Sequence, residues 1–224
     1  MMKKIACWSG SMRKEVVLIR HGETEWNAQL RWQGHTDIPL NSNGVQQAES
    51  LAEELRSFAL DVLFSSDLVR AYQTSKIISA RLDLPIFTSD GLREVDVGAA
   101  EGLGYDETVK RFGEESISRW RSSLPVDLSF AFPDGETKLE ALERVQRAIG
   151  DFLQNTGAVR VAIVSHGMLI RTFLQHIFPE LDMPSVLSNC GYVPLSYELP
   201  ESGWSLRDDV SLSSTEPLPG RRSQ

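Results

Sequence analysis

Apolar positions along the chain alternate between short unbroken runs and longer stretches at helical spacing. The run Val16-Val17-Leu18-Ile19 holds three β-branched residues and predicts a strand buried on both faces. Similar runs occupy 61–64 and 161–164. Between the runs, apolar residues recur every three or four positions. This spacing predicts helices after an N-cap at 41–43, over 67–81 and over 136–154.

Strands that alternate with helices in this order pair in parallel through right-handed crossovers. The sequence therefore predicts the fold class α/β, as a three-layer sandwich with a mostly parallel, doubly wound sheet and helices on both faces. We expect a loose N-terminal leader at 1–14, one folded domain at 15–207 and a disordered tail at 208–224, which is rich in Ser, Pro and charge.

Two further segments complete the predicted domain. Residues 103–135, with a helix over 106–121, form an insertion of the size of a lid. Segments 192–199 and 204–206 flank Pro200-Glu201-Ser202-Gly203, which predicts a closing hairpin. The sequence leaves the oligomeric state open, and an edge strand of that hairpin, which could pair with a second copy, makes a homodimer one possible form.

Polar residues follow the predicted strands in a repeated pattern. Arg20-His21-Gly22 ends the first strand and Ser165-His166-Gly167 ends the strand at 161–164, in a chain with only four histidines. A looser third copy, Ser65-Ser66, leads into the helix that carries Arg70. Ligands of open α/β sheets bind beyond the carboxyl ends of the strands. Arg20, His21, Arg70 and His166 are therefore expected to meet in one cationic pocket.

Charge and cysteine content limit the partners and the cellular location that we expect for this protein. The 224 residues carry a formal net charge of −8, which argues against nucleic acid as a partner. Cys7 and Cys190 are the only cysteines, too few for a disulfide framework, which favours a reducing, cytoplasmic location. No stretch has the length of a signal-peptide core or of a membrane span, so no membrane association is expected.

Two arginines and two histidines at one site suit the chemistry of phosphate esters. The planar guanidinium fork binds two phosphate oxygens at once, and its charge stabilises the transferring phosphoryl group. A neutral imidazole can act as the nucleophile and form a phosphohistidine. The leaving oxygen needs a proton, and Glu94 is the carboxylic acid best placed to give it. Asp96 and Glu101 lie close by in the sequence, and a helix-capping role for Glu94 is the competing interpretation.

Longer motifs resemble the histidine phosphatase superfamily, in its phosphoglycerate-mutase-like branch. They are Arg20-His21-Gly22-Glu23-Thr24-Glu25-Trp26-Asn27, Gln33-Gly34, Ser66 to Thr74, Leu92-Arg93-Glu94 with Glu101-Gly102, and Ser165-His166-Gly167. The resemblance covers roughly 15–200 and makes 15–207 a catalytic domain. It implies that His21 is the phosphorylated nucleophile and that Glu94 is the proton donor.

The same resemblance assigns the substrate contacts. Arg20, Arg70 and His166 correspond to the family's phosphate clamp, and Asn27, Gln33, Gly34 and Gly167 to positions beside the phosphate. It implies a small phosphorylated substrate, no metal and no other cofactor. Ala100 departs from the family, because many phosphatases carry Trp before Glu101-Gly102, and this change is expected to alter the pocket wall.

Phosphatase and phosphoglycerate mutase are the two main readings of the resemblance. Met168-Leu169-Ile170 after the second His-Gly, and Pro133-Asp134-Gly135-Glu136 before a helix, resemble phosphatase members. Arg111 and Trp120-Arg121 echo the mutase lid, although Arg111, Arg119 and Arg121 are also what an exposed helix face would carry. Phosphatase is the preferred prediction.

Two other functions fit some of the same residues. His21, His166 and a carboxylate could hold zinc, but two arginines in the pocket would repel a dication. A non-catalytic module that binds phosphorylated ligands would not need the nucleophile and the acid, and both are present. His35 and His176 are expected to be surface or packing residues, and Trp26 and Trp32 either line the pocket or pack in the core.

Overall fold

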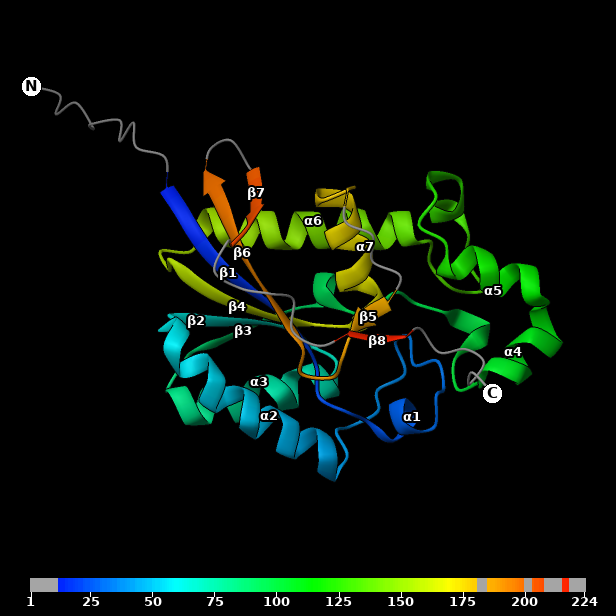
Figure 1. Cartoon of the computed structure of the whole chain (residues 1–224), viewed down its shortest axis with the longest axis horizontal. Helices are drawn as coiled ribbons and strands as arrows, with labels where there is room; N and C mark the ends of the chain where they lie inside the picture. The colour runs from blue at the N-terminus through cyan, green and yellow to red at the C-terminus, as the bar shows by residue number, and fades with distance from the viewer. Residues whose placement is uncertain (1–11, 181–184, 200–202, 208–214, 218–224) are drawn as a thin grey trace, which may run out of the picture.

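The computed structural model describes residues 12–180, 185–199, 203–207 and 215–217, and its centre is a six-stranded sheet. The strand order is β3-β2-β4-β1-β6-β7 (Figure 1). These strands are β1 Met12–Arg20, β2 Val62–Ser66, β3 Ile86–Ser89, β4 Arg160–Ser165, β6 Tyr192–Leu199 and β7 Gly203–Leu206. The first four strands in this order, from β3 to β1, are parallel, whereas β6 and β7 pair antiparallel. The predicted mostly parallel α/β sheet and its closing hairpin are confirmed.

Helices cover both faces of the sheet. On one face lie α2 Ser42–Glu54 and α3 Val69–Leu82, and on the other α6 Lys138–Asn155 and α7 Gly167–Ile177 (Figure 1). Alternate residues of β1 point to opposite faces of the sheet. Val17 and Ile19 pack in the hydrophobic cluster with α2 and α3, and Val16 and Leu18 pack in the cluster with α6 and α7. The three-layer sandwich follows from this double burial. No helix of the described segments combines the length and apolar character needed to cross a membrane.

Helix starts agree with the predicted caps. Asn41 accepts a hydrogen bond from the Gly44 N–H at 2.8 Å and begins α2. Thr137 forms a capping box with Glu140 and begins α6. Short helical pieces fill the connections: α1 Glu25–Ala28, η1 Leu55–Phe58, η2 Asp90–Leu92, η3 Gly98–Ala100 and η4 Pro125–Ser129.

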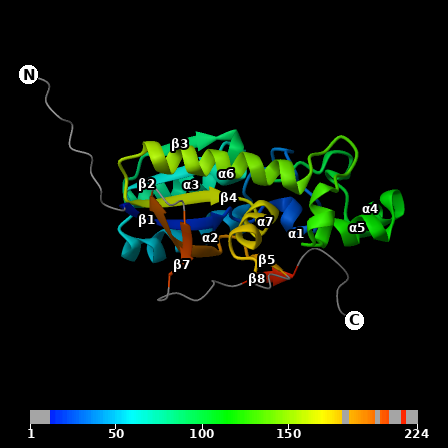
Figure 2. The same cartoon turned by 90° about the horizontal axis from the view of Figure 1, so that it is seen from above.

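The insertion at 103–135 lies at one end of the molecule in both views (Figures 1 and 2). The expectation of one helix over 106–121 is wrong, because α4 Tyr105–Phe112 and α5 Glu114–Arg121 are separate helices. Gly113 between them has φ +84°, a backbone conformation outside the right-handed helix. The sequence contained the glycine, but its helical spacing on both sides concealed the break.

Both predicted ends of the domain need correction. Strand β1 starts at Met12, inside the expected leader, because β6 pairs with it out to Leu199. Lys14 is 3% exposed and donates to the carbonyls of Thr156 and Ala158, so a charged residue is accommodated within the sheet. In the expected tail, β8 Thr215–Pro217 pairs with β5 Ser185–Leu187. The rest of 208–224, and residues 1–11, lie outside the described residues.

Candidate active site

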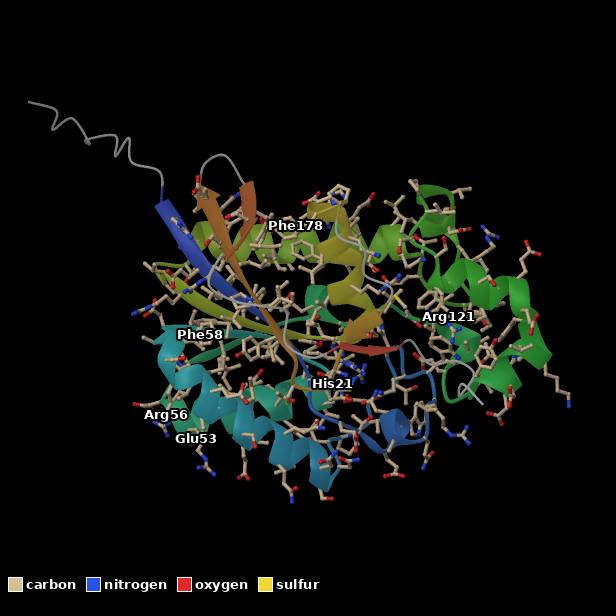
Figure 3. The ribbon with its side chains drawn as sticks, viewed as in Figure 1. His21, Glu53, Arg56, Phe58, Arg121 and Phe178 are labelled. Carbon is tan, nitrogen blue, oxygen red and sulfur yellow. The ribbon has the colours of Figure 1, made fainter. Side chains whose placement is uncertain are left out.

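The two His-Gly pairs meet because β1 and β4 are neighbouring parallel strands. Arg20 is in register with Ser165, and the His21 N–H donates to the Ser165 carbonyl at 3.0 Å. The ring centroids of His21 and His166 are 5.1 Å apart, with the planes inclined at 58°. Figure 3 shows His21 at the end of β1, in the middle of the molecule. The reused strand-end pattern therefore builds one site, as expected.

His21 is held in the tautomer that a nucleophile requires. Its Nδ1 lies 2.7 Å from the Gly22 carbonyl oxygen, which can only accept, so Nδ1 carries the proton. Burial, followed by the charges of Arg70 and Arg20, holds the pKa of His21 well below its ordinary value. The imidazole is therefore neutral at pH 7, and its Nε2 carries a free lone pair.

His166 is fully buried behind the His21 ring. Its Nε2 lies 2.9 Å from the Ser66 hydroxyl at the end of β2, and its Nδ1 has no hydrogen-bond partner. Burial is the main reason that its pKa is well below the ordinary value, with Arg70 and His21 adding to the effect. Because an unsatisfied buried nitrogen is costly, Nδ1 is a hydrogen-bonding position available to a ligand.

Arg70 extends from the first turn of α3 beneath the pocket and is 0% exposed. Its Nη1 and Nη2 donate to the carbonyls of Thr36 and Gly34 at 2.9 and 2.8 Å, while Nε has no partner. Burial lowers the pKa of Arg70 to about 10, which leaves it charged at pH 7. Arg20 lines the pocket from the opposite side, with Nη1 bonded to the Leu187 carbonyl.

Glycine is required where the arginine and the chain approach one another. A Cβ added at Gly167 would stand 3.2 Å from Nε of Arg20. Gly34 has φ +51°, and a Cβ there would lie 2.3 Å from a carboxylate oxygen of Glu101. Gly167 thus allows close packing on the Arg20 guanidinium, and Gly34 allows close packing on the Glu101 carboxylate.

A cavity of about 90 Å³ opens in front of these groups. It is lined by Arg20, His21, Asn27, Arg31, Trp32, Gln33, Gly34, Arg70, Glu94, Val95, Val97, Trp120, Gly167 and Met168. The structure thus brings the predicted site residues to one cavity, except that His166 lies behind the lining. Ala100 is fully buried and does not line the cavity.

The geometry separates Glu94 from the two carboxylates near it in sequence. Glu94 lines the cavity, and its Oε1 and Oε2 accept the Leu169 and Met168 N–H groups at 2.9 and 3.1 Å. Glu101 instead accepts the His35 N–H at 2.6 Å, and Asp96 accepts the Gly98 N–H at 2.8 Å. Glu94 therefore caps the start of α7 and faces the pocket, so the two interpretations of this residue are compatible.

Several lining residues were not found from the sequence. Trp120 reaches the cavity from α5 of the insertion and packs edge-on against Trp32, with ring centroids 6.2 Å apart. Trp32 was one of two candidates for the wall, and the other, Trp26, lies outside the lining. Asn189 donates to the His21 carbonyl at 3.0 Å, so a residue far away along the chain holds the main chain of His21. The sequence indicated Trp120 only through its resemblance to the mutase lid, and it gave no signal for Asn189.

The remaining charged candidates fall into two groups. Arg111 is exposed, Arg119 pairs with Asp127 at 3.1 Å, and neither lines the cavity. Arg121 is half-buried, with its guanidinium 5.1 Å from the centre of the Tyr105 ring, so the expectation of an exposed face is wrong for it (Figure 3). His176 is exposed as predicted, whereas His35 is half-buried and bonded to the main chain of the site.

Metal-binding side chains do not gather in the part of the chain that the structure describes. Among these residues, no three His, Cys, Asp or Glu side chains are grouped closely enough to hold an ion. The cavity instead carries three arginines, Arg20, Arg31 and Arg70, among its lining residues. The arrangement suits an anion.

Comparisons with known proteins agree with this geometry. Residues 16–207 match the histidine phosphatase superfamily (branch 1). The chain is 34% identical over 196 residues to a protein named uncharacterized phosphatase PhoE of Bacillus subtilis, covering 86% of this chain and 92% of that one. It is 36% identical over 197 residues to the probable phosphoglycerate mutase GpmB of an Enterobacter species, covering 85% and 87%.

Among solved structures, the fold resembles a mycobacterial glucosyl-3-phosphoglycerate phosphatase in complex with VO₃. The TM-score is 0.78 at 25% identity, over 90% of this chain and all of the other.

Proposed function

Because the chain belongs to the histidine phosphatase superfamily, we propose that it is a phosphomonoesterase that acts on a small phosphorylated metabolite. The observation that carries this proposal is the state of His21: a neutral imidazole whose Nδ1 is bonded to the Gly22 carbonyl, which lines the same cavity as Arg20 and Arg70. Phosphomonoesters are among the most inert biological substrates, so a nucleophile and concentrated positive charge are what their hydrolysis requires.

In the first step, Nε2 of His21 attacks the phosphorus atom and the bond to the ester oxygen breaks. Arg20, Arg70 and Nδ1 of His166 bind the phosphoryl oxygens, whose negative charge spreads in the transition state. The leaving oxygen takes a proton from the carboxyl group of Glu94. The products of this step are a free alcohol and a phosphohistidine at His21.

In the second step, the Glu94 carboxylate removes a proton from water and the resulting hydroxide attacks the phosphorus. The P–N bond breaks, its electron pair returns to Nε2 of His21, and inorganic phosphate leaves. Glu94 ends the cycle protonated, as it began. One carboxyl group thus serves as acid and then as base, which its place at the cavity wall supports.

Hydrolysis fits the cavity better than the mutase reaction, although relatives of both kinds are similar to this chain. A mutase holds a bisphosphorylated intermediate and needs a second cationic phosphate site. Arg31 is the one further arginine among the lining residues, and it donates to the Gly102 carbonyl and lies 3.3 Å from the Glu107 carboxylate. A partner of opposite charge makes Arg31 a weak second phosphate site.

A paired time course with 3-phosphoglycerate and a panel of small phosphomonoesters, in EDTA, tests the proposal. Release of free phosphate without 2-phosphoglycerate is expected and would establish a phosphatase that needs no dissociable metal. Formation of 2-phosphoglycerate without phosphate would mean that the protein is a mutase. Binding of phosphate without either product would mean a non-catalytic module.

His21→Ala is expected to abolish the phosphoenzyme and to lower kcat by on the order of a thousandfold or more, because it removes the Nε2 lone pair that attacks phosphorus. The measurement is acid quench after mixing with substrate, followed by detection of acid-labile, base-stable phosphate on the protein. His176→Ala, at an exposed histidine, is the matched control and should behave as wild type. Phosphate on the His21→Ala protein would assign the nucleophile elsewhere.

A further inference from the structure

Glu94 lies in a segment, 93–97, that belongs to no helix or strand. No ladder of backbone hydrogen bonds therefore fixes the direction of its peptide groups. The Glu94 carbonyl oxygen instead accepts two side-chain hydrogen bonds, from Nη2 of Arg144 at 2.7 Å and from Nε2 of His35 at 2.8 Å. Neither donor lines the cavity.

Arg144, on α6, holds this segment at several points. Its Nη1 donates to the carbonyls of Arg93 and Gly91 at 2.7 and 3.1 Å, while Nη2 holds Glu94. One planar group thus fixes three carbonyls within four residues. A lysine has a single donor atom on a flexible stem and cannot reproduce this pattern.

Glu136 fixes the direction of that guanidinium. Its carboxylate forms a bidentate pair with Arg144, in which Nε and Oε2 are 3.0 Å apart. The same carboxylate accepts the Asp96 N–H at 2.9 Å, so it also holds the chain two residues beyond Glu94. The Arg144 and Glu136 side chains are 21% and 19% exposed, which shields the pair from solvent and salt.

We propose that Arg144, oriented by Glu136, is a positioning residue for proton transfer by Glu94, an inference that rests on the proposed function. Arg144 holds the main chain of Glu94, and the first N–H groups of α7 hold its carboxyl group. Glu94 is therefore held both at its main chain and at its carboxyl group. Loss of the hydrogen bonds from Arg144 to the main chain displaces the Glu94 carboxyl group from the ester oxygen. A displacement of about 1 Å can lower the rate on the order of a hundredfold.

Two substrates of similar shape separate positioning of the acid from general damage. Phenyl phosphate releases a basic phenolate that needs a proton, whereas 4-nitrophenyl phosphate releases a stable anion that does not. The quantity to compare is kcat/KM, because it reports only the steps up to departure of the leaving group. We expect Arg144→Lys to lower kcat/KM about tenfold or more for phenyl phosphate and less than about threefold for 4-nitrophenyl phosphate.

Three further variants complete the experiment. Glu94→Gln should show the same leaving-group dependence, and Glu94→Gln with Arg144→Lys should lose little more than Glu94→Gln alone, because both act through one carboxyl group. Arg56→Lys is the control, since Arg56 pairs with Glu53 on the exposed surface far from His21 (Figure 3). It should leave both substrates unchanged. Because Arg144→Lys keeps the charge, it also keeps the field of Arg144 at His166.

Equal losses on both substrates would overturn the positioning role and make Arg144 a merely structural residue, and so would additive losses in the double variant. Competitive inhibition by inorganic phosphate should be unchanged in Arg144→Lys, which shows that the phosphate clamp is intact. If Glu94→Gln itself shows no leaving-group dependence while Arg144→Lys does, the proposed role of Glu94 fails and this inference fails with it. If wild type hydrolyses neither ester, the proposed function fails first.

Discussion

Single residues of the candidate active site also hold the main chain around the cavity. Arg70 binds the carbonyls of Gly34 and Thr36 with two of its nitrogens and leaves Nε for the cavity. Glu101, a carboxylate close to Glu94 in the sequence, shapes the same turn through the His35 N–H and the Thr36 hydroxyl. The proposed phosphate-binding role of Arg70 therefore depends on a turn in which Gly34 has a positive φ.

Gly34→Ala should lower the free energy of unfolding by about 1–3 kcal/mol, because Gly34 has a positive φ and an added Cβ would displace the Glu101 carboxylate. It should also weaken competitive inhibition by phosphate, since the Gly34 carbonyl orients Arg70. Urea unfolding and inhibition constants measure the two effects. Gly157→Ala, where a Cβ meets nothing within 4 Å, is the control and should stay within about 0.5 kcal/mol. If phosphate inhibits Gly34→Ala as strongly as wild type, the backbone conformation at Gly34 does not control phosphate binding by Arg70.

At the scale of elements, the buried cation Lys138 helps to hold the insertion against the sandwich. Lys138, in the first turn of α6, is 1% exposed, and its Nζ donates to the carbonyls of Trp120 at 2.9 Å, Arg119 at 3.2 Å and Ser122. These carbonyls close the end of α5, where a positive charge is favourable. Burial lowers the pKa of Lys138 to about 8, so the side chain is mostly charged at pH 7.

Lys138→Met should destabilise the protein by about 1–3 kcal/mol at pH 7, because it leaves the end of α5 without its donor. Since Trp120 lines the cavity, KM should rise more than kcat falls. Thermal unfolding and steady-state kinetics at pH 7 are the measurements. Lys110→Met, at an exposed lysine of α4, should change neither. A loss of stability without a change in KM would show that α5 does not shape the substrate site.

At the scale of the whole molecule, an acidic chain encloses a cationic pocket. The net charge is −8, yet the described residues around the cavity include three arginines beside two neutral histidines. The β-sheet makes this possible, because parallel strands bring polar residues from distant parts of the chain to one edge while their apolar residues are buried.

Stability of the whole fold should fall as the solution becomes more acidic than about pH 6.5. His21 and His166 have depressed pKa values in the folded state, so below the ordinary histidine pKa the unfolded chain binds protons that the folded chain does not. Each histidine then contributes a loss of up to about 1.4 kcal/mol per pH unit. Urea unfolding between pH 7.5 and 5.5 should show a shallower pH dependence in His166→Asn than in wild type. His176→Asn is the control, and equal slopes in all three proteins would contradict the depressed pKa of His166.

Hydrophobic periodicity predicted the elements that carry the site. Val16-Val17-Leu18-Ile19 and 161–164 became the central strands, because residues buried on both faces must be apolar without interruption. Arg20, His21 and His166 were predictable for the same reason, since each lies within two residues of the end of such a run. Glu94 was predicted as the best-placed acid among three neighbouring carboxylates, and the structure shows that it lines the cavity and bonds to the start of α7.

The sequence by itself determined the class of fold, the strand ends and the residues that meet there, because these follow from local pattern and from one rule of sheet geometry. Tertiary structure decided what covers the pocket and what holds its parts. Trp120, Asn189 and Arg144 act on residues that are far away along the chain, from elements whose own pattern indicates only a helix face or a loop. Their roles depend on directions and distances between elements, which no local pattern of apolar and polar residues encodes.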